Sequence, residues 1–198
     1  MDIILSYFII PGLTLLLPGK TNWFTSNFSV AGAYFPQNIL LIIWAIVIAR
    51  FYHRFMKRTI GQTTSFLKLE TELVLTDVSA YLLVCSVFIP YRPQIYPFFS
   101  FIHLATAFTA TIIFFISITL MAIRLYTQAP DLFSLPVALL VLAIACTVIL
   151  LLFGNFLISS ALEIFLTIFS CIWLQLFDQR IRILSRRKSL KTRVRIRV

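Results

Sequence analysis

Charged residues are scarce in this chain of 198 residues. Asp, Glu, Lys and Arg make up 12% of the positions, whereas 60% are hydrophobic. A soluble protein of this length needs more polar surface than such a composition can supply. Together with a mean hydropathy of +0.97, this scarcity excludes an ordinary soluble domain and predicts an integral membrane protein.

Several sequence motifs that are typical of particular enzymes are also missing. The chain has no HExxH, no GxSxG and no Walker loop, so metal hydrolysis, triad hydrolysis and nucleotide use lack their usual signatures. We therefore expect no metal and no cofactor. The only cysteines, Cys85, Cys146 and Cys171, all lie in apolar runs, which favours small buried side chains over disulfides.

Six apolar stretches predict an all-α, polytopic bundle of six transmembrane helices followed by a basic tail. A span needs about 20 residues, and the first stretch is short for one. It lacks the basic start and the cleavage site of a signal peptide, so we expect it to be retained. The spans are expected at Ile3–Leu17, Gln37–Phe55, Glu70–Ile89, Phe98–Leu125, Leu135–Phe153 and Ile158–Phe177, with the membrane domain at 1–178 and the tail at 179–198.

The connecting segments carry fewer apolar residues. Lys20–Asn38 contains Pro and Gly breakers and is predicted to be a structured or partly re-entrant loop rather than a helix. Ile60–Leu69 is predicted to be a polar connector, and Thr127–Ser134 a short loop.

The distribution of Lys and Arg predicts the orientation. With both termini in the cytoplasm, 15 of the 17 basic residues lie in cytoplasmic segments and only Lys20 and Arg92 lie in outer loops. Cytoplasmic loops of membrane proteins carry this excess of positive charge. The sequence thus predicts a multi-pass protein of a plasma or inner membrane with both ends cytoplasmic.

Most of the net charge of +10 is concentrated near the carboxyl terminus, where nine basic residues lie in Arg180–Arg197. No basic, aromatic-rich domain is present, so we expect no nucleic-acid partner. In water the tail would repel itself and be disordered, whereas on a bilayer it could lie flat against anionic headgroups. The predicted membrane-surface residues are Arg50, Arg54, Lys57, Arg58, Arg180, Arg182, Arg186, Arg187 and Lys188.

One polar stripe runs along the predicted helix Phe98–Leu125. His103, Ala110, Ser117 and Arg124 recur every seven residues, with Thr106 beside them. Polar groups are costly in lipid, so this face should turn toward other helices. The sequence predicts a polar seam between the third, fourth and sixth spans.

Two pairs of ionisable side chains are possible within this seam. Glu163 shares a helix face with Ser159, Thr167 and Ser170 and lies at about the depth of His103, near the outer surface. Asp77 and Arg124 lie nearer the inner one. Either pair could be purely structural, could bind a ligand or, for His103 and Glu163, could catalyse a reaction. The candidate ligand-binding residues are His103, Thr106, Glu163, Ser159, Asp77 and Arg124.

Aromatic residues gather at the predicted outer boundary. An aromatic belt at the membrane interface accounts for them better than a ligand-binding cage does. They are Trp23, Phe24, Phe28, Tyr34, Tyr91, Tyr96 and Phe98.

Three segments carry a resemblance: NWFTSNFSVAGAYFPQNIL, IPYRP and IHLATAFTATIIFF, within about residues 22–115. This pattern is similar to small six-helix membrane proteins of the FGF-receptor-activating-protein and damage-regulated-autophagy-modulator type and their prokaryotic relatives. The resemblance implies roles for Asn27, Ser29 and His103 and a function in handling lipids or lipid anchors. The chain lacks the acidic residue that the resemblance would place beside Ser29.

The function expected from these patterns is non-catalytic: binding of a lipid or small amphiphile, or service as a membrane partner or sensor subunit. One alternative is a lipid-modifying enzyme that uses His103 and Glu163. Another is the substrate-binding subunit of a small-molecule transporter, which often has six helices in about this length.

Overall fold

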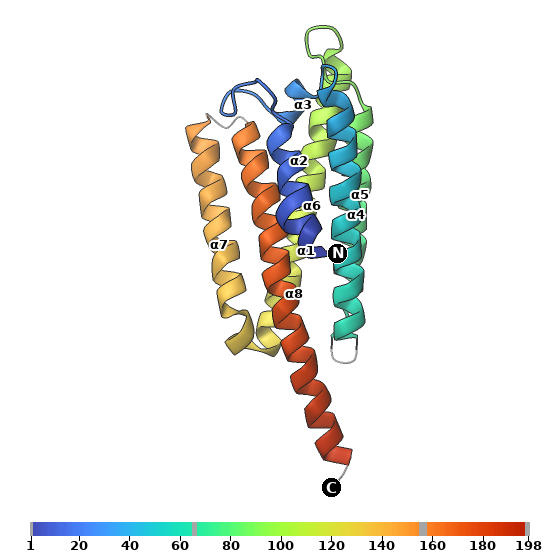
Figure 1. Ribbon diagram of the computed structural model, residues 1–198, viewed down its shortest axis with the longest axis vertical. Coiled ribbons are helices and arrows are strands. Elements are labelled where there is room, and N and C mark those ends of the chain that lie inside the picture. The colour runs from blue at the N-terminus through green and yellow to red at the C-terminus, as the bar shows by residue number, and fades with distance from the viewer. Residues whose placement is uncertain (1, 65–66, 155–157, 197–198) are drawn as a thin grey trace.

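The computed structural model describes residues 2–64, 67–154 and 158–196, with side chains from Ile3 to Arg187 in these ranges, where it is helical without strands (Figure 1). The first helical segment is a run of α1, η1 and α2, and α3 is a single turn. The helices are α1 Asp2–Ile4, η1 Leu5–Ile9, α2 Ile10–Leu16, α3 Phe28–Ala31, α4 Gln37–Thr63, α5 Glu70–Phe88, α6 Pro97–Gln128, α7 Pro130–Phe153 and α8 Ser160–Ile196.

Five of these helices are long and apolar enough to cross a membrane: α4, α5, α6, α7 and residues Ser160–Arg187 of α8. The run α1–η1–α2 is apolar but spans only Asp2–Leu16. At 1.5 Å per residue it is about 22 Å long, shorter than a typical 30 Å hydrocarbon core. In Figure 1 its amino-terminal end lies level with the middle of α4.

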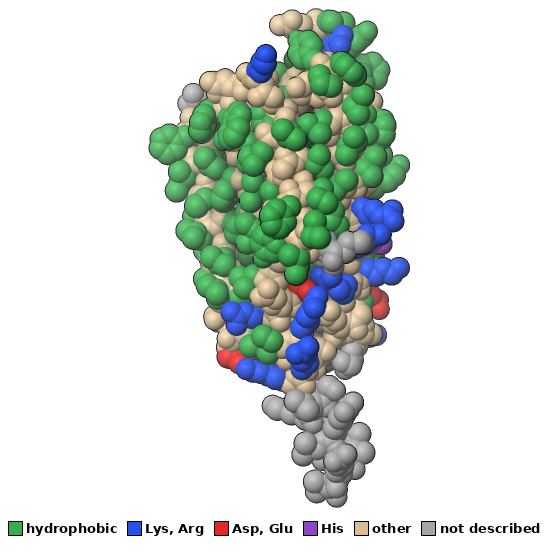
Figure 2. Space-filling model, viewed as in Figure 1, with side chains coloured by type: hydrophobic (Ala, Val, Ile, Leu, Met, Phe, Trp, Pro, Cys, Tyr) green, Lys and Arg blue, Asp and Glu red, His purple; other side chains and the backbone are tan. Residues whose placement is uncertain are grey.

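The long helices form one bundle (Figure 1). We call the end that holds α3 the loop end and the opposite end, where α8 extends beyond its neighbours, the tail end. The first helix packs between α4 and α8, α5 packs on α4 and α6, and α7 packs on α6 and α8. Figure 2 shows hydrophobic side chains over most of the bundle and basic side chains gathered toward the tail end.

The first helix is held in the bundle by a polar stripe. Ser6, Ile10 and Thr14 are each 0% exposed, four residues apart on one face. Gln175 Nε2 donates to Ser6 Oγ at 2.6 Å, and Trp44 Nε1 donates to Thr14 Oγ1 at 2.9 Å. Gly19, with φ +57°, then reverses the chain after α2 in a left-handed conformation that glycine adopts without strain.

The polar stripe of α6 faces protein, as the sequence pattern predicts. His103, Ala110 and Ser117 are all at most 3% exposed, whereas the side chain of Arg124, the fourth member of the stripe, is 44% exposed. Ser79 of α5 donates to the Ala110 carbonyl at 2.8 Å, and Ser117 donates to the Glu72 carbonyl at 2.7 Å. These bonds join α5 to α6, where small side chains allow the two backbones to approach closely.

Several predicted boundaries were wrong. α4 continues to Thr63 through the basic segment and into the predicted connector. Ala129 alone separates α6 from α7, since Pro130 starts the new helix in place of the loop predicted at Thr127–Ser134. Residues 179–196, the predicted basic tail, continue α8 as helix. The predicted loop Lys20–Asn38 contains the helical turn α3.

The predicted pairing of Asp77 with Arg124 was also wrong. Arg124 Nε lies 3.0 Å from Glu72 Oε1, and its Nη1 donates to the Lys68 carbonyl at 3.1 Å. The Glu72 side chain is 0% exposed. Asp77 instead lies 2.6 Å from His53 Nδ1 on α4. α5 begins at the tail end, so Glu72 lies five residues, or more than one helical turn, closer to that end than Asp77 does. Arg124, near the end of α6, lies at the level of Glu72.

The Glu72–Arg124 pair gives a prediction about stability. Arg124→Ala should leave a fully buried carboxylate without its cation and lower the free energy of unfolding by about 3 kcal/mol. Thermal unfolding of the detergent-purified protein measures this loss. Adding Glu72→Gln should recover part of the loss, and Arg50→Ala, at an exposed position on α4, should have no effect. A wild-type melting temperature for Arg124→Ala would contradict the buried pair.

Candidate functional site: a cavity between the helices

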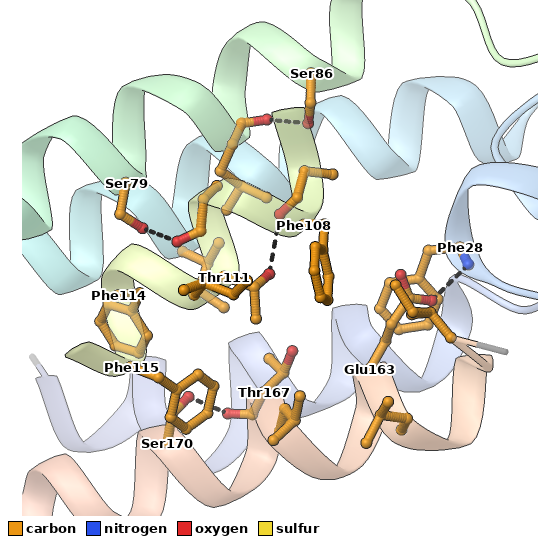
Figure 3. A pocket seen from close by; sticks show the side chains of 18 of the residues that line it. Phe28, Ser79, Ser86, Phe108, Thr111, Phe114, Phe115, Glu163, Thr167 and Ser170 are labelled. Carbon is orange, nitrogen blue, oxygen red and sulfur yellow. Dashed lines mark hydrogen bonds between the residues drawn. The ribbon is translucent and has the colours of Figure 1, made fainter. Parts of the chain in front are cut away.

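A cavity of about 550 Å³ lies among α4, α5, α6, α7 and α8 and reaches residues 27–29 at the loop end (Figure 3). Most of its wall is apolar. Phe108 and Phe115 point from α6 toward α8 in Figure 3. Phe108 of α6 and Val148 of α7, which both line the cavity, are each 50% exposed, so the cavity opens to the outside of the bundle between these helices.

Hydroxyl groups along the middle of the cavity are already satisfied by backbone carbonyls. Thr111, Thr147 and Ser170 each donate to a carbonyl of their own helix, at 2.8 to 3.1 Å. Tyr52 and Ser170 also bond to each other at 2.6 Å. The protons of these hydroxyls are therefore already used, so they offer no donor to a guest, and the body of the cavity is mostly apolar.

The loop end of the cavity is different, because His103 has polar partners there. The His103 ring is 3% exposed and has Nδ1 3.0 Å from the Ile89 carbonyl and Nε2 2.7 Å from Ser29 Oγ. A carbonyl can only accept, so Nδ1 carries the proton and donates it. In the neutral ring Nε2 is then the acceptor for the Ser29 hydroxyl. Tyr91 packs on the ring with centroids 5.2 Å apart.

Ser29 is held in place by the single turn α3. Asn27 is its N-cap, and the Asn27 side-chain oxygen accepts from the Val30 N–H at 2.8 Å. Phe28 anchors the turn, since its ring is 2% exposed and packs edge-on against Trp44 at 5.5 Å. The turn thus carries one large apolar anchor and, next to it, a serine that lines the cavity.

Glu163 holds the same segment from the opposite wall. Its Oε2 accepts from the Phe28 N–H at 2.7 Å (Figure 3). The segment before it is also tied to the start of α8, because the Ser160 N–H donates to the Ser26 carbonyl and the Ala161 N–H to the Trp23 carbonyl. Residues 23–29 therefore form a cover over the loop end of the bundle, fastened mainly to α8; we call it the loop cover.

The structure brings His103 and Glu163 to one cavity but not into one pair. Both line it, and they bind neighbouring residues of the loop cover, Ser29 and Phe28. The direct pairing was wrong because the sequence fixes depth along a helix and gives no information about a loop segment that inserts between two helices. Ser29 came only from the family resemblance; the local signal was the N-cap residue Asn27 before an apolar turn.

The other candidate ligand-binding residues lie apart from this polar end. Thr106 donates to the Ile102 carbonyl and Ser159 Oγ accepts from the Leu162 N–H, so both serve their own helices. Asp77 and Arg124 form the ion pairs described above. Thr106, Ser159, Asp77 and Arg124 are not among the residues that line the cavity.

Some of the predicted membrane-surface residues form ion pairs. Arg58 and Arg182 both contact the buried Asp178, at 3.2 and 2.7 Å, and Arg187 contacts Asp131 at 2.7 Å. Arg50, Arg54, Lys57 and Arg186 are exposed, Arg180 is partly buried, and the side chain of Lys188 lies outside the described residues.

The aromatic residues of the predicted belt divide into two groups. Trp23, Phe24, Tyr34, Tyr96 and Phe98 are each at least 42% exposed, as a membrane interface requires. Phe28 and Tyr91 belong instead to the site, the first as the anchor of α3 and the second against the His103 ring.

Comparison with protein-family models, with curated proteins and with solved structures finds no match for this chain. Among the described residues, no group of three or more His, Cys, Asp or Glu side chains could hold a metal ion. The chemistry of the site therefore has to follow from the cavity and the loop cover themselves.

The clamp formed by Glu163 gives a prediction about dynamics. Glu163→Ala should remove the hydrogen bond to the Phe28 N–H and raise amide hydrogen exchange in residues 22–33 by roughly 10-fold. Hydrogen-exchange mass spectrometry measures the change. Glu163→Gln keeps an acceptor and should exchange more slowly than the alanine variant. Thr147→Ala, on the far wall, should leave the loop cover unchanged; equal exchange in the Glu163→Ala and wild-type proteins would contradict the clamp.

Proposed function

We propose that this chain is a multi-pass integral membrane protein that binds a lipid or a similar amphiphile in the cavity between its helices. The observation that carries the proposal is the division of that cavity into a polar end at Ser29, His103 and Glu163 and an apolar body of about 550 Å³. An amphiphile has the same division, with a polar head and a hydrocarbon chain. The volume lies within the ~300–1,000 Å³ range of sites for small ligands.

The side opening supports a lipid rather than a water-soluble ligand. The walls that meet the outside are apolar residues of α6 and α7, such as Ile112, Ile116 and Ile144, each at least 43% exposed. In a bilayer these side chains face acyl chains, so a lipid could enter sideways without crossing water. A polar solute that entered by this side opening would have to lose its hydration before it reached the polar end.

The surface of the bundle supports insertion in a membrane. Five helices have the necessary length and composition, and large exposed hydrophobic side chains occur on all of them. Basic residues outnumber acidic ones toward the tail end, which we assign to the cytoplasm. This orientation puts the loop cover and the polar end of the cavity at the outer face. The exposed Arg50, Arg54 and Lys57 would meet anionic headgroups at the inner face.

The first helix fits this orientation with either of two depths. If it crosses the whole bilayer, Met1 is cytoplasmic and the protein has six spans. If it enters only partway, the other five spans keep their directions, because α4 still begins at the loop end.

Filling the cavity tests the proposal. The protein, reconstituted in nanodiscs with a phospholipid that carries a diazirine in its acyl chain, should crosslink to residues of α6 and α8 on illumination. Ala107 lines the cavity, so Ala107→Trp should lower the yield of this crosslink at least 5-fold by occupying the space. Peptide mass spectrometry locates and measures the crosslink.

The matched control is Ala105→Trp, which adds the same side chain to an exposed position of the same helix outside the cavity lining. It should crosslink inside the cavity like the wild type. A wild-type protein that crosslinks only at its outer, lipid-facing positions, or equal yields for both Trp variants, would overturn the binding proposal.

A further inference from the structure

We propose that Ser29 is a nucleophile activated by His103 and that the loop end of the cavity cleaves the acyl ester of a bound lipid. The geometry is that of a serine with its general base: Ser29 Oγ lies 2.7 Å from His103 Nε2. This activity rests on the proposed function, since the ester must sit in the cavity, but it adds a reaction that lipid binding alone does not require.

The orientation of the imidazole is fixed for this role. The Ile89 carbonyl holds the proton on Nδ1, which leaves the Nε2 lone pair directed at the serine hydroxyl. A serine protease uses a carboxylate where this protein has a carbonyl. The carbonyl still fixes the tautomer but stabilises the imidazolium less. We therefore expect a slow enzyme whose substrates have good leaving groups, which favours esters over amides.

The position of the serine matches the chemistry of a lipid. Ser29 is partly exposed and lines the polar end of the cavity, while hydrocarbon-like walls extend from it along α6 and α8. A lipid with its chain along those walls has its ester carbonyl between chain and head, at the boundary that Ser29 occupies. Ser29 also lies on the loop cover, at the end of the bundle that we assign to the outer, aqueous face, so water can reach it.

The reaction balances with water as the only co-reactant. Ser29 Oγ attacks the ester carbonyl carbon as its proton passes to His103 Nε2. The bond to the lipid alcohol breaks, and the leaving oxygen takes the proton back from Nε2. Water then attacks the acyl-serine, again giving a proton to Nε2, and Ser29 leaves with that proton as the free fatty acid departs.

Two neighbours complete the site without reacting. Asn27 also lines the cavity, and because its side-chain oxygen accepts from the Val30 N–H, we assign its NH₂ group to the oxyanion. Glu163 is a positioning residue, because it holds the Phe28 N–H and through it the segment that carries Ser29.

A fluorophosphonate with a hexadecyl chain tests this inference on the detergent-purified protein. This reagent phosphonylates activated serines and spares ordinary ones. The wild type should gain one adduct, which peptide mass spectrometry should map to Ser29. Ser29→Ala should not react, whereas Ser26→Ala, three residues away on the same loop cover, should react like the wild type. His103→Gln should react at least 100-fold more slowly, the contribution typical of a general base.

Folding and binding are checked on the same samples. Ser29→Ala should still fold, with a melting temperature lowered by the loss of the bond to His103 Nε2, whereas Ser26→Ala should keep both the wild-type melting temperature and the diazirine-lipid crosslink inside the cavity. A wild-type protein that gives this crosslink but no adduct at Ser29 would overturn the nucleophile and leave lipid binding intact. An adduct forming at the wild-type rate in a folded His103→Gln protein would likewise overturn it. Loss of the cavity crosslink in the wild type would instead count against the proposed function.

Discussion

Polar groups inside an apolar helix bundle must find their hydrogen bonds within the protein, and most of this structure depends on that constraint. Hydroxyl groups in the helices donate hydrogen bonds to backbone carbonyls of their own helix, as Thr111 and Thr147 do. Charged groups meet in pairs, as Glu72 and Arg124 do. His103 has no helical neighbour that satisfies both of its nitrogens, so the end of α5 and the loop cover supply the partners. The loop cover, which is fastened mainly to α8, thus also satisfies the histidine on this face of α6.

The same constraint separates what could be predicted from the sequence from what could not. Hydropathy predicted α4 to α8, because a long apolar run has few alternatives to a helix in lipid. The seven-residue spacing predicted that one face of α6 turns toward protein, and His103, Ala110 and Ser117 are buried there, whereas Arg124 at its end is partly exposed. These properties depend on residues close together in the chain. The predicted boundaries were less accurate at two places. The helix α4 continues to Thr63 through polar residues, and the single residue Ala129 separates α6 from α7; neither feature has a strong local signal in the sequence.

Which side chains pair with an ionisable group depends on how the helices pack against one another, and sequence patterns do not predict that packing well. Asp77 and Arg124 were compatible in approximate depth, but Glu72 is on the face of α5 that meets α6, while Asp77 meets His53 of α4. A shift of five residues along a helix is about 7.5 Å and a rotation of 140°. That shift decides which neighbouring helix a side chain reaches. The separation of His103 from Glu163 by Ser29 and Phe28 has another cause, because a loop carries no periodicity from which its position could be derived.

The contrast between the two ends of the bundle bears on where chemistry can occur. At the tail end, Glu72, Asp178 and Asp131 are each matched by arginine, and the pairs join helices to one another. At the loop end, Glu163 binds a backbone N–H and His103 binds a hydroxyl, so neither is neutralised by an opposite charge among the described residues. Groups that neutralise each other mainly stabilise a fold. A histidine that accepts from a serine beside a cavity keeps its capacity to move a proton, so the loop end and not the tail end has the groups for the proposed reaction.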